Sequence, residues 1–406
     1  MSSDKVPPTS SSGRTLTAGS AATPPAKKGN GEVDFSSVLA GASVSRTAAK
    51  PAVSRWHSLN FLATPSLPRI NWPWLQPNFD RTIDRTFAAG LNAVKEVLAP
   101  VEPKPSGPTM SLDDYPRPLG DNGKGIHWIP TVKQTPDVVD TFVSEAVSMG
   151  MKWVVFLNDG ANIGDNDYLV KQLAAAGIEP VMRIYTPGLA PINGDIKKMV
   201  QHFTGLGVRY FQLYNEPNLM VETGGQYPDA NHYLDVWVPA AKQVIEGGGL
   251  PGFGALSPQG EMDDRDFLRQ SLTGLIQRGA GYLLNQGWLA MHNYTGPRPL
   301  NDPDGFMRFK QYNNIVQQIL GRQIPVIGTE GGTHISEYVN ESQQIDMVTN
   351  AYNYMERQRE PYNFAYTYWI IANGHDSAWD EHALFTDNGP TGLAQALKNM
   401  AAGVKS

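Results

Sequence analysis

The chain has 406 residues, 41% of them hydrophobic and only 18% charged, and its formal net charge is −6. A chain of this length can form one large domain with an appendage, and its negative charge argues against nucleic acid as a partner, because a polyanion is bound through clustered cations. The absence of cysteine excludes disulfide bonds, thiol nucleophiles and cysteine-based zinc sites.

Residues 1–55 form a segment that is rich in Ser, Thr, Ala, Gly and Pro. Such a composition cannot bury enough apolar surface to offset the entropy lost on ordering, so we expect a disordered N-terminal tail. No apolar stretch follows a basic start, so the sequence predicts no conventional signal peptide. No run of about 18 apolar residues occurs, so we expect no ordinary transmembrane helix. These patterns leave the compartment open.

Residues 56–110 form a second segment, in which an aromatic stretch precedes an amphipathic helical segment and a Pro-rich linker. The helix is predicted from apolar side chains at helical spacing, namely Ile83, Phe87, Leu91, Val94 and Leu98. Residues 1–110 carry 12 Lys and Arg against 7 Asp and Glu. A basic arm with such a helix can lie on an anionic membrane surface or dock a partner. The alternative, which we favour, is that the helix packs against the following domain.

Eight short apolar strands alternate with amphipathic helices from about Gly123 onwards. The predicted strands are residues 125–130, 153–158, 180–185, 209–214, 252–257, 288–293, 325–329 and 363–369. This alternation implies parallel strands with right-handed crossovers, and eight units match the closed (β/α)₈ (TIM) barrel, which usually has about 250 residues. The turn IPTVKQTPD after the first strand lacks the glycines of a dinucleotide-binding sheet. We therefore predict an α/β barrel over residues 111–406.

A barrel places its active site at the carboxyl ends of its strands. Read in chain order, these ends carry His127, Trp128, Asn158, Asp159, Arg183, Tyr185, Asn215, Glu216, Gln259, Glu261, His292, Tyr294, Glu330, Trp369 and Asn373. Two carboxylates, Glu216 and Glu330, enter from nearly opposite sides of the ring. The sequence therefore predicts a polar cleft with a pair of acidic groups facing each other.

A pair of carboxylates across a sugar-sized cleft is what the hydrolysis of a glycosidic bond requires. One must be protonated to release the leaving oxygen, and the other must be ionised to attack the oxocarbenium-like carbon. We assign the acid/base role to Glu216, beside which Asn215 offers an amide to the sugar. We assign the nucleophile role to Glu330, whose ionisation would be favoured by hydrogen-bond donors and cations. The candidate donors are His292, Tyr294 and Arg183.

These motifs resemble those of clan A of the glycoside hydrolases. The resemblance rests on Asn215-Glu216-Pro217 at the fourth strand, Glu330 at the seventh, His292-x-Tyr294 at the sixth and Trp369 at the eighth, and covers residues 124–400. It implies a retaining enzyme that cleaves O-glycosidic bonds, β bonds above all, in an oligo- or polysaccharide. Trp369 would form the floor of the sugar site.

The sequence departs from this clan at the second strand. Many members have an arginine there beside the nucleophile, whereas this strand ends in FLND. Arg183 on the third strand is the candidate substitute, and we expect Trp128 on the first strand to be a further sugar contact. No tight pair of metal-binding histidines occurs, so we expect neither a metal nor another cofactor.

Three alternatives compete with a hydrolase. An aldolase or a phosphate-ester isomerase would need a strand-end lysine or a phosphate-binding glycine loop, and neither is found. A barrel that only binds carbohydrate would have no need of both carboxylates. A transglycosylase would use the same residues as a hydrolase, so the sequence leaves that alternative open.

Overall fold

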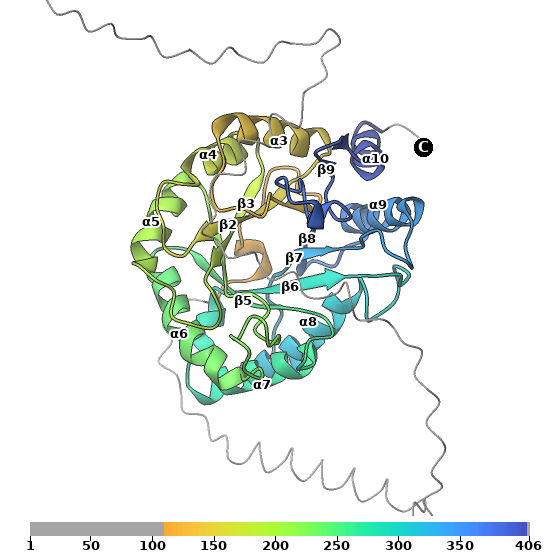
Figure 1. The fold of residues 1–406 in the computed structure, drawn as a ribbon. Helices are drawn as coiled ribbons and strands as arrows, with labels where there is room; N and C mark the ends of the chain where they lie inside the picture. Colours follow the sequence, from red (N-terminus) through yellow and green to blue (C-terminus); the bar gives the residue numbers. More distant parts are fainter. Residues whose placement is uncertain (1–108, 404–406) are drawn as a thin grey trace, which may run out of the picture. The chain divides into compact units, whose positions relative to one another are not determined.

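The computed structural model describes residues 109–403. Within them, eight parallel strands close into one barrel in chain order, and β1 pairs with both β2 and β8. The helices surround this barrel (Figure 1). The predicted (β/α)₈ barrel is therefore confirmed. The predicted tail and almost all of the helical segment 56–110 lie outside the described residues, and the domain boundary at 110/111 stays a prediction.

Each predicted strand overlaps one observed strand. The strands are β1 (Lys124–His127), β2 (Trp153–Asp159), β3 (Glu179–Tyr185), β4 (Tyr210–Leu213), β5 (Leu250–Leu256), β6 (Trp288–Tyr294), β7 (Val326–Gly332) and β8 (Asn363–Tyr368). Almost every strand residue is buried, because one side of each strand faces the barrel interior and the other faces the helices. This double burial explains why the strands are apolar runs in the sequence.

Five of the eight helices named here, α5, α6, α7, α9 and α10, begin at a residue whose side chain caps them. They are α3 (Pro136–Ser148), α4 (Asp167–Ala175), α5 (Ile196–Leu206), α6 (Ala230–Glu246), α7 (Asp264–Gln277), α8 (Arg308–Leu320), α9 (Glu341–Arg357) and α10 (Gly392–Ala401). Asp195 caps α5 by accepting a hydrogen bond from the backbone N–H of Lys198 at 2.9 Å, and the helix ends at Gly207 with φ of 115°. Among the described residues, none of the helices is both long and apolar enough to cross a membrane.

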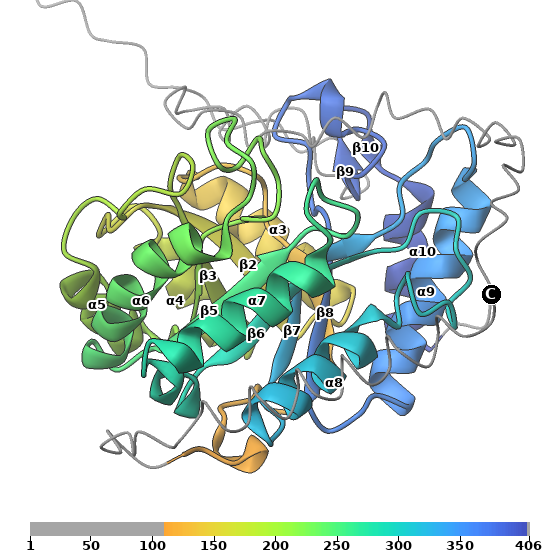
Figure 2. The same cartoon turned by 90° about the horizontal axis from the view of Figure 1, so that it is seen from below.

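The amino end of the barrel is closed by residues 110–117, which include the short helix η2 (Leu112–Asp114). The Tyr115 hydroxyl donates to the carbonyl of Gly287 at 2.7 Å, and its ring meets Phe364 edge-on at 6.2 Å. Arg117 lies 3.8 Å above the ring of Phe364. Figure 2 places this segment, in orange, at the end of the barrel opposite β9 (Phe385–Thr386) and β10 (Gly389–Pro390). These residues therefore form the floor of the barrel.

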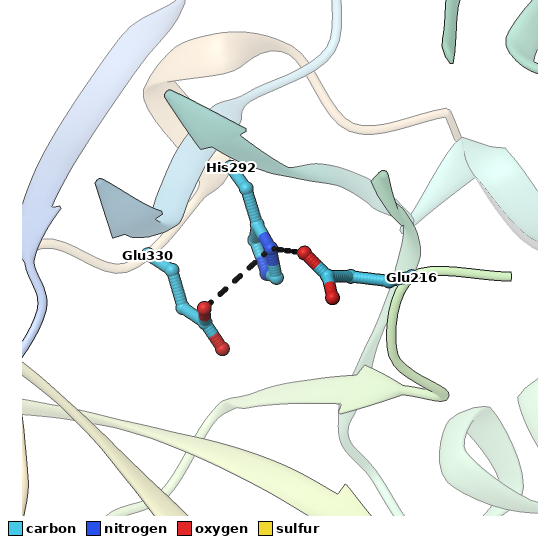
Figure 3. Close-up of side chains that lie close together, drawn as sticks. All are labelled: Glu216, His292 and Glu330. Carbon is cyan, nitrogen blue, oxygen red and sulfur yellow. Dashed lines mark hydrogen bonds and ion pairs between the residues drawn. The ribbon is translucent and has the colours of Figure 1, made fainter. Parts of the chain in front are cut away.

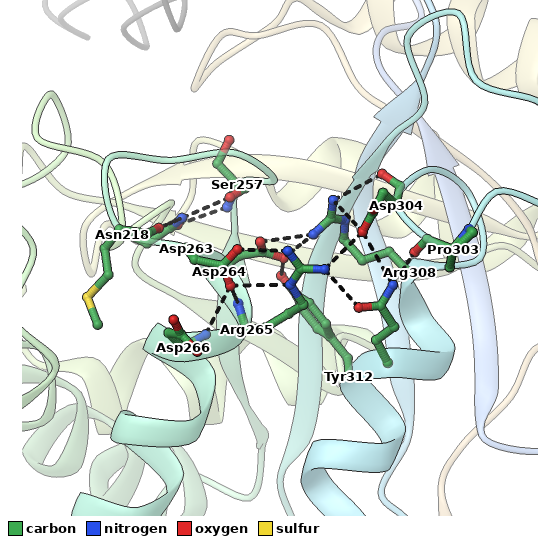
Figure 4. Close-up of polar contacts among 12 residues, drawn as sticks. Asn218, Ser257, Asp263, Asp264, Arg265, Asp266, Pro303, Asp304, Arg308 and Tyr312 are labelled. Carbon is green, nitrogen blue, oxygen red and sulfur yellow. Dashed lines mark hydrogen bonds and ion pairs between the residues drawn. The ribbon is translucent and has the colours of Figure 1, made fainter. Parts of the chain in front are cut away.

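A buried polar network joins α7 to α8 (Figure 4). One Nη atom of Arg308 donates to both carboxylate oxygens of Asp264 at 2.9 Å, and the Tyr312 hydroxyl donates to the same carboxylate at 2.6 Å. The side chains of Arg308 and Asp264 are 2% and 1% exposed. Because a charge this deeply buried needs its counter-charge, the pair ties the loops after β5 and β6 to fixed positions.

Removing the floor segment should destabilise the barrel. A chain that begins at Thr109 keeps every floor contact described above and serves as the reference. A chain that begins at Leu119 exposes the lower aromatic rings to water and should melt several degrees lower, since apolar burial is lost. Differential scanning calorimetry of the two truncated chains tests this, and equal melting temperatures would contradict the floor role.

Breaking the α7–α8 ion pair should cost more than replacing it. Asp264→Leu leaves the Arg308 charge buried without its partner and should lower the free energy of unfolding by about 3–5 kcal/mol. The double variant Asp264→Leu/Arg308→Met removes both charges and should recover most of that loss. Chemical denaturation of both variants measures the difference, and a double variant no more stable than the single one would show that the ion pair itself stabilises the fold.

Candidate active site

The loop after β4 holds Glu216 in a specific backbone conformation. Tyr214 and Glu216 have φ values of 63° and 37°, a region that costs energy for residues other than glycine. The backbone N–H of Glu216 donates to the Ala255 carbonyl of β5 at 2.9 Å. Asn218 completes the connection, because its amide donates to the Ser257 carbonyl at 2.8 Å and accepts from the Ser257 N–H at 2.9 Å (Figure 4). The Glu216 side chain is therefore positioned by contacts between two strand ends.

Glu330 lies inside β7, two residues before its end, rather than at its last position. It is 7% exposed and sits opposite His292 in the ladder between β6 and β7. The Tyr294 hydroxyl donates to Glu330 Oε2 at 2.7 Å, and the guanidinium of Arg183 forms an ion pair with Oε1. Two other strands, β3 and β6, thus supply the partners of this one carboxylate.

These partners keep Glu330 ionised. Burial by itself raises the pKa of a carboxyl group, but the charges of His292, Arg183 and His127 and the hydrogen bond from Tyr294 outweigh it and lower the pKa of Glu330 to about 2. An ionised carboxylate with a buried cation beside it is the state that a nucleophile requires.

His292 connects the two carboxylates (Figure 3). Its Nδ1 lies 2.8 Å from Glu216 Oε1 and 3.6 Å from Glu330 Oε2. Burial lowers the pKa of His292, but the two neighbouring carboxylates outweigh burial and raise it. Potential ligand atoms of the three residues, one from each, all lie within 4.8 Å of one another. The two acidic groups are therefore close together, with a shared imidazole beside them.

The same three groups have the spacing of a metal site, but their environment suits one poorly. A metal ligand must be a deprotonated imidazole or a free carboxylate oxygen. Here the pKa of His292 is raised, and Glu330 already pairs with the cation of Arg183, whose charge would repel a second cation. The donor set favours acid–base chemistry over metal binding.

Trp369 follows directly after β8, and its backbone N–H donates to the Gly331 carbonyl of β7 at 3.0 Å. Its side chain is 3% exposed, and its indole N–H has no hydrogen-bond partner within residues 109–403. The ring centroid lies 4.3 Å from that of His127 and 5.3 Å from that of Trp379. The structure therefore brings Trp369 into the part of the barrel that holds Glu330.

Trp128 does not fit the predicted role of a sugar contact. Its side chain is fully buried, its indole N–H donates to Gln134 at 3.0 Å, and its ring meets Phe142 of α3 edge-on. Successive side chains at a strand end point to opposite sides, so Trp128 packs against the helices while the preceding residue, His127, turns toward Glu330. We correct the assignment accordingly: Trp128 belongs to the core.

The glycines beside Glu330 have a reason that the sequence did not suggest. A Cβ atom on Gly331 would lie 2.8 Å from the ring of Tyr366, and one on Gly332, whose φ is 105°, would collide with the ring of Tyr368. Both residues are needed so that β7 can pass the tyrosines of β8. Glycine at these two positions therefore allows the close packing of β7 against β8.

Asn215 makes a contact that the sequence did not predict. Its Nδ2 donates to Oε1 of Glu222 at 3.0 Å, while its Oδ1 is buried and has no partner in the part of the chain that the structure describes. Burial and the charge of Glu216 raise the pKa of Glu222 to about 7. Sequence reasoning missed Glu222 because it lies in the loop, six residues beyond Glu216, and at no strand end.

Comparisons with known proteins find distant structural likenesses. No family model and no curated protein matches the sequence. Similar solved structures include a family 39 glycoside hydrolase from Bacteroides cellulosilyticus WH2, with 14% identity, a TM-score of 0.48, and coverage of 71% of this chain and 64% of that one. A GH128 endo-β-1,3-glucanase from Pseudomonas viridiflava has 17% identity, a TM-score of 0.48, and coverage of 68% and 97%. An endo-1,4-β-mannanase from Rhizomucor miehei has 15% identity, a TM-score of 0.43, and coverage of 74% and 98%. At this level of identity the likeness concerns the barrel alone, and the function rests on the site.

Proposed function

We propose that the protein is a retaining glycoside hydrolase that cleaves O-glycosidic bonds, β bonds above all, in an oligo- or polysaccharide. Glu330 acts as the nucleophile and Glu216 as the acid/base. The observation that carries this proposal is the close approach of two buried carboxyl groups, with oxygens within 4.8 Å of each other, beside one imidazole.

The distance between the carboxyl groups favours retention of configuration. A retaining enzyme holds them about 5–5.5 Å apart, because the nucleophile must reach the anomeric carbon directly. An inverting enzyme holds them about 6.5–9.5 Å apart, because a water molecule must fit between sugar and base. One oxygen of Glu216 and one of Glu330 lie within 4.8 Å of each other, which supports the first arrangement.

The reaction proceeds in two displacements. In the first, a carboxylate oxygen of Glu330 bonds to the anomeric carbon while Glu216 gives its proton to the departing glycosidic oxygen. In the second, water attacks the same carbon, Glu216 takes a proton from that water, and the bond to Glu330 breaks. Both residues return to their starting states. The Tyr294 hydroxyl keeps its hydrogen bond to Glu330 Oε2 during both displacements. This contact holds the carboxylate in its attacking orientation.

Arg183 takes the place of the arginine that the second strand lacks. It comes from β3, and its guanidinium reaches Glu330 Oε1, so that the cation beside the nucleophile enters from a neighbouring strand. A guanidinium keeps its charge at every working pH and presents a planar set of donors. This arrangement supports the assignment of Glu330, rather than Glu216, as the permanently ionised group.

Glu330→Gln should abolish turnover, because no glycosyl-enzyme can form without the carboxylate. On a panel of aryl β-glycosides, we expect a loss in kcat of at least about a thousandfold even with good leaving groups. A 2-deoxy-2-fluoro glycoside with a good leaving group should label the wild type by one sugar in intact-mass spectra and should leave the variant unlabelled. Glu261→Gln, which alters an acidic residue outside the pair, serves as the control. Labelling of the Glu330 variant would reject the assignment.

Glu216→Ala should lose mainly the steps that need proton transfer. Activated aryl glycosides should still form the glycosyl-enzyme, which then accumulates, and azide should raise turnover about tenfold or more by replacing the base-assisted water. The product should be a glycosyl azide with the configuration of the substrate, identified by NMR. If azide instead rescued the Glu330 variant and gave the inverted azide, the two roles would be reversed.

A further inference from the structure

Glu222 is a third carboxyl group beside the catalytic pair, and the loop after β4 determines its place. The backbone N–H of Leu219 donates to the Glu216 carbonyl at 2.9 Å, and the N–H of Glu222 donates to the Leu219 carbonyl at 3.2 Å. The N–H of Met220 donates to the carboxylate of Glu261 at 2.9 Å. Two successive turns and an anchor to the next loop therefore hold Glu222 at a fixed position relative to Glu216.

The hydrogen bond between Asn215 and Glu222 fixes the orientation of the Asn215 amide. Since Nδ2 donates one hydrogen to Glu222 at 3.0 Å, the amide cannot exchange its oxygen and nitrogen without losing that bond. The amide can therefore offer a ligand two things: a buried Oδ1 with no partner among the described residues, and the second hydrogen of Nδ2. A sugar hydroxyl can donate to this oxygen and supply the hydrogen bond that the oxygen lacks in its buried position.

Charged groups from several strands act on Glu222. Glu216 at the end of β4 and Glu330 of β7 raise its pKa, whereas Arg183 of β3 lowers it, and Tyr185 of β3 has its own pKa raised by Glu222. Burial and these neighbouring carboxylates together favour the protonated form of Glu222, whereas an exposed glutamate is ionised at neutral pH.

On the basis of the proposed function, we infer that Glu222 is a positioning residue of the active site: it fixes the amide of Asn215 toward the substrate. Glu222 does not touch the reacting atoms. It acts through Asn215, so its removal affects the recognition of a sugar hydroxyl, and the ionisation of Glu222 itself, whose pKa is raised to about 7, makes that recognition depend on pH.

The test compares Glu222→Gln, Glu222→Ala and the control Glu246→Gln, an exposed residue at the end of α6, on an aryl β-glycoside that the wild type cleaves, with kcat and KM measured from pH 4 to 9. Glu222→Gln keeps an amide oxygen for Asn215 but has no acidic group, so the change in kcat/KM near pH 7 should disappear with a modest loss at the optimum. Glu222→Ala should also lose that change and should show a further loss of about tenfold in kcat/KM. Glu246→Gln should keep the wild-type profile.

Two further measurements keep the inference separate from the proposed function. Carboxyl ¹³C chemical shifts of the glutamate-labelled wild type and Glu222→Gln report the ionisation of Glu222 without any substrate, and the variant should lose the titration nearest pH 7. Asn215→Ala and Glu222→Ala should combine less than additively in kcat/KM, because both remove one contact. An unchanged profile near pH 7 and an unchanged titration in a folded Glu222 variant would overturn the inference, whereas a wild type that cleaves no glycoside would overturn the proposed function and leave the titration to decide the inference.

Discussion

The site depends on keeping one carboxylate ionised inside the barrel. A buried charge without partners costs several kcal/mol, and Glu330 avoids that cost because side chains from two other strands contact it. Arg183 from β3 supplies a permanent cation, and His292 and Tyr294 from β6 supply an imidazole and a hydroxyl. A closed barrel is well suited to this purpose, since its ring of parallel strands points groups from distant parts of the chain at one axis. The arrangement of the strands thus determines which side chains surround Glu330 and keep it ionised.

The acidic groups of the site lie close together and therefore influence one another's charge. His292 lies close to both Glu216 and Glu330, so both carboxylates act on its pKa and raise it. Glu222 adds a further acidic group to this set through Glu216. Measured pH limits of activity therefore belong to the cluster, and the effects of single substitutions within it will not add up to the effect of removing the whole.

Much of the fold and the principal acidic pair could be predicted from the sequence, for identifiable reasons. Doubly buried strands appear as apolar runs, and their ends are marked by polar residues. The features that the sequence did not predict correctly also have physical reasons. Trp128 and His127 are adjacent, and composition does not reveal which of them turns inward, because a shift of one residue exchanges the two faces of a strand. Glu222 lies in a loop, where no periodicity predicts that it reaches Asn215. Glycine is needed at position 332 because a tyrosine ring of the next strand lies against it. This contact can be recognised only once the pairing of the strands is known.

The floor of the barrel has a consequence for how the chain comes together. Tyr115 precedes the first strand, yet its hydroxyl bonds to Gly287, 172 residues further along the chain. The last strand, similarly, must return to pair with the first. During synthesis, the floor segment therefore has none of these partners until the loop before β6 has left the ribosome, and the barrel closes only once β8 is complete. Contacts of such long range form slowly, so the aromatic residues of the floor are exposed for most of the time in which the chain is being made.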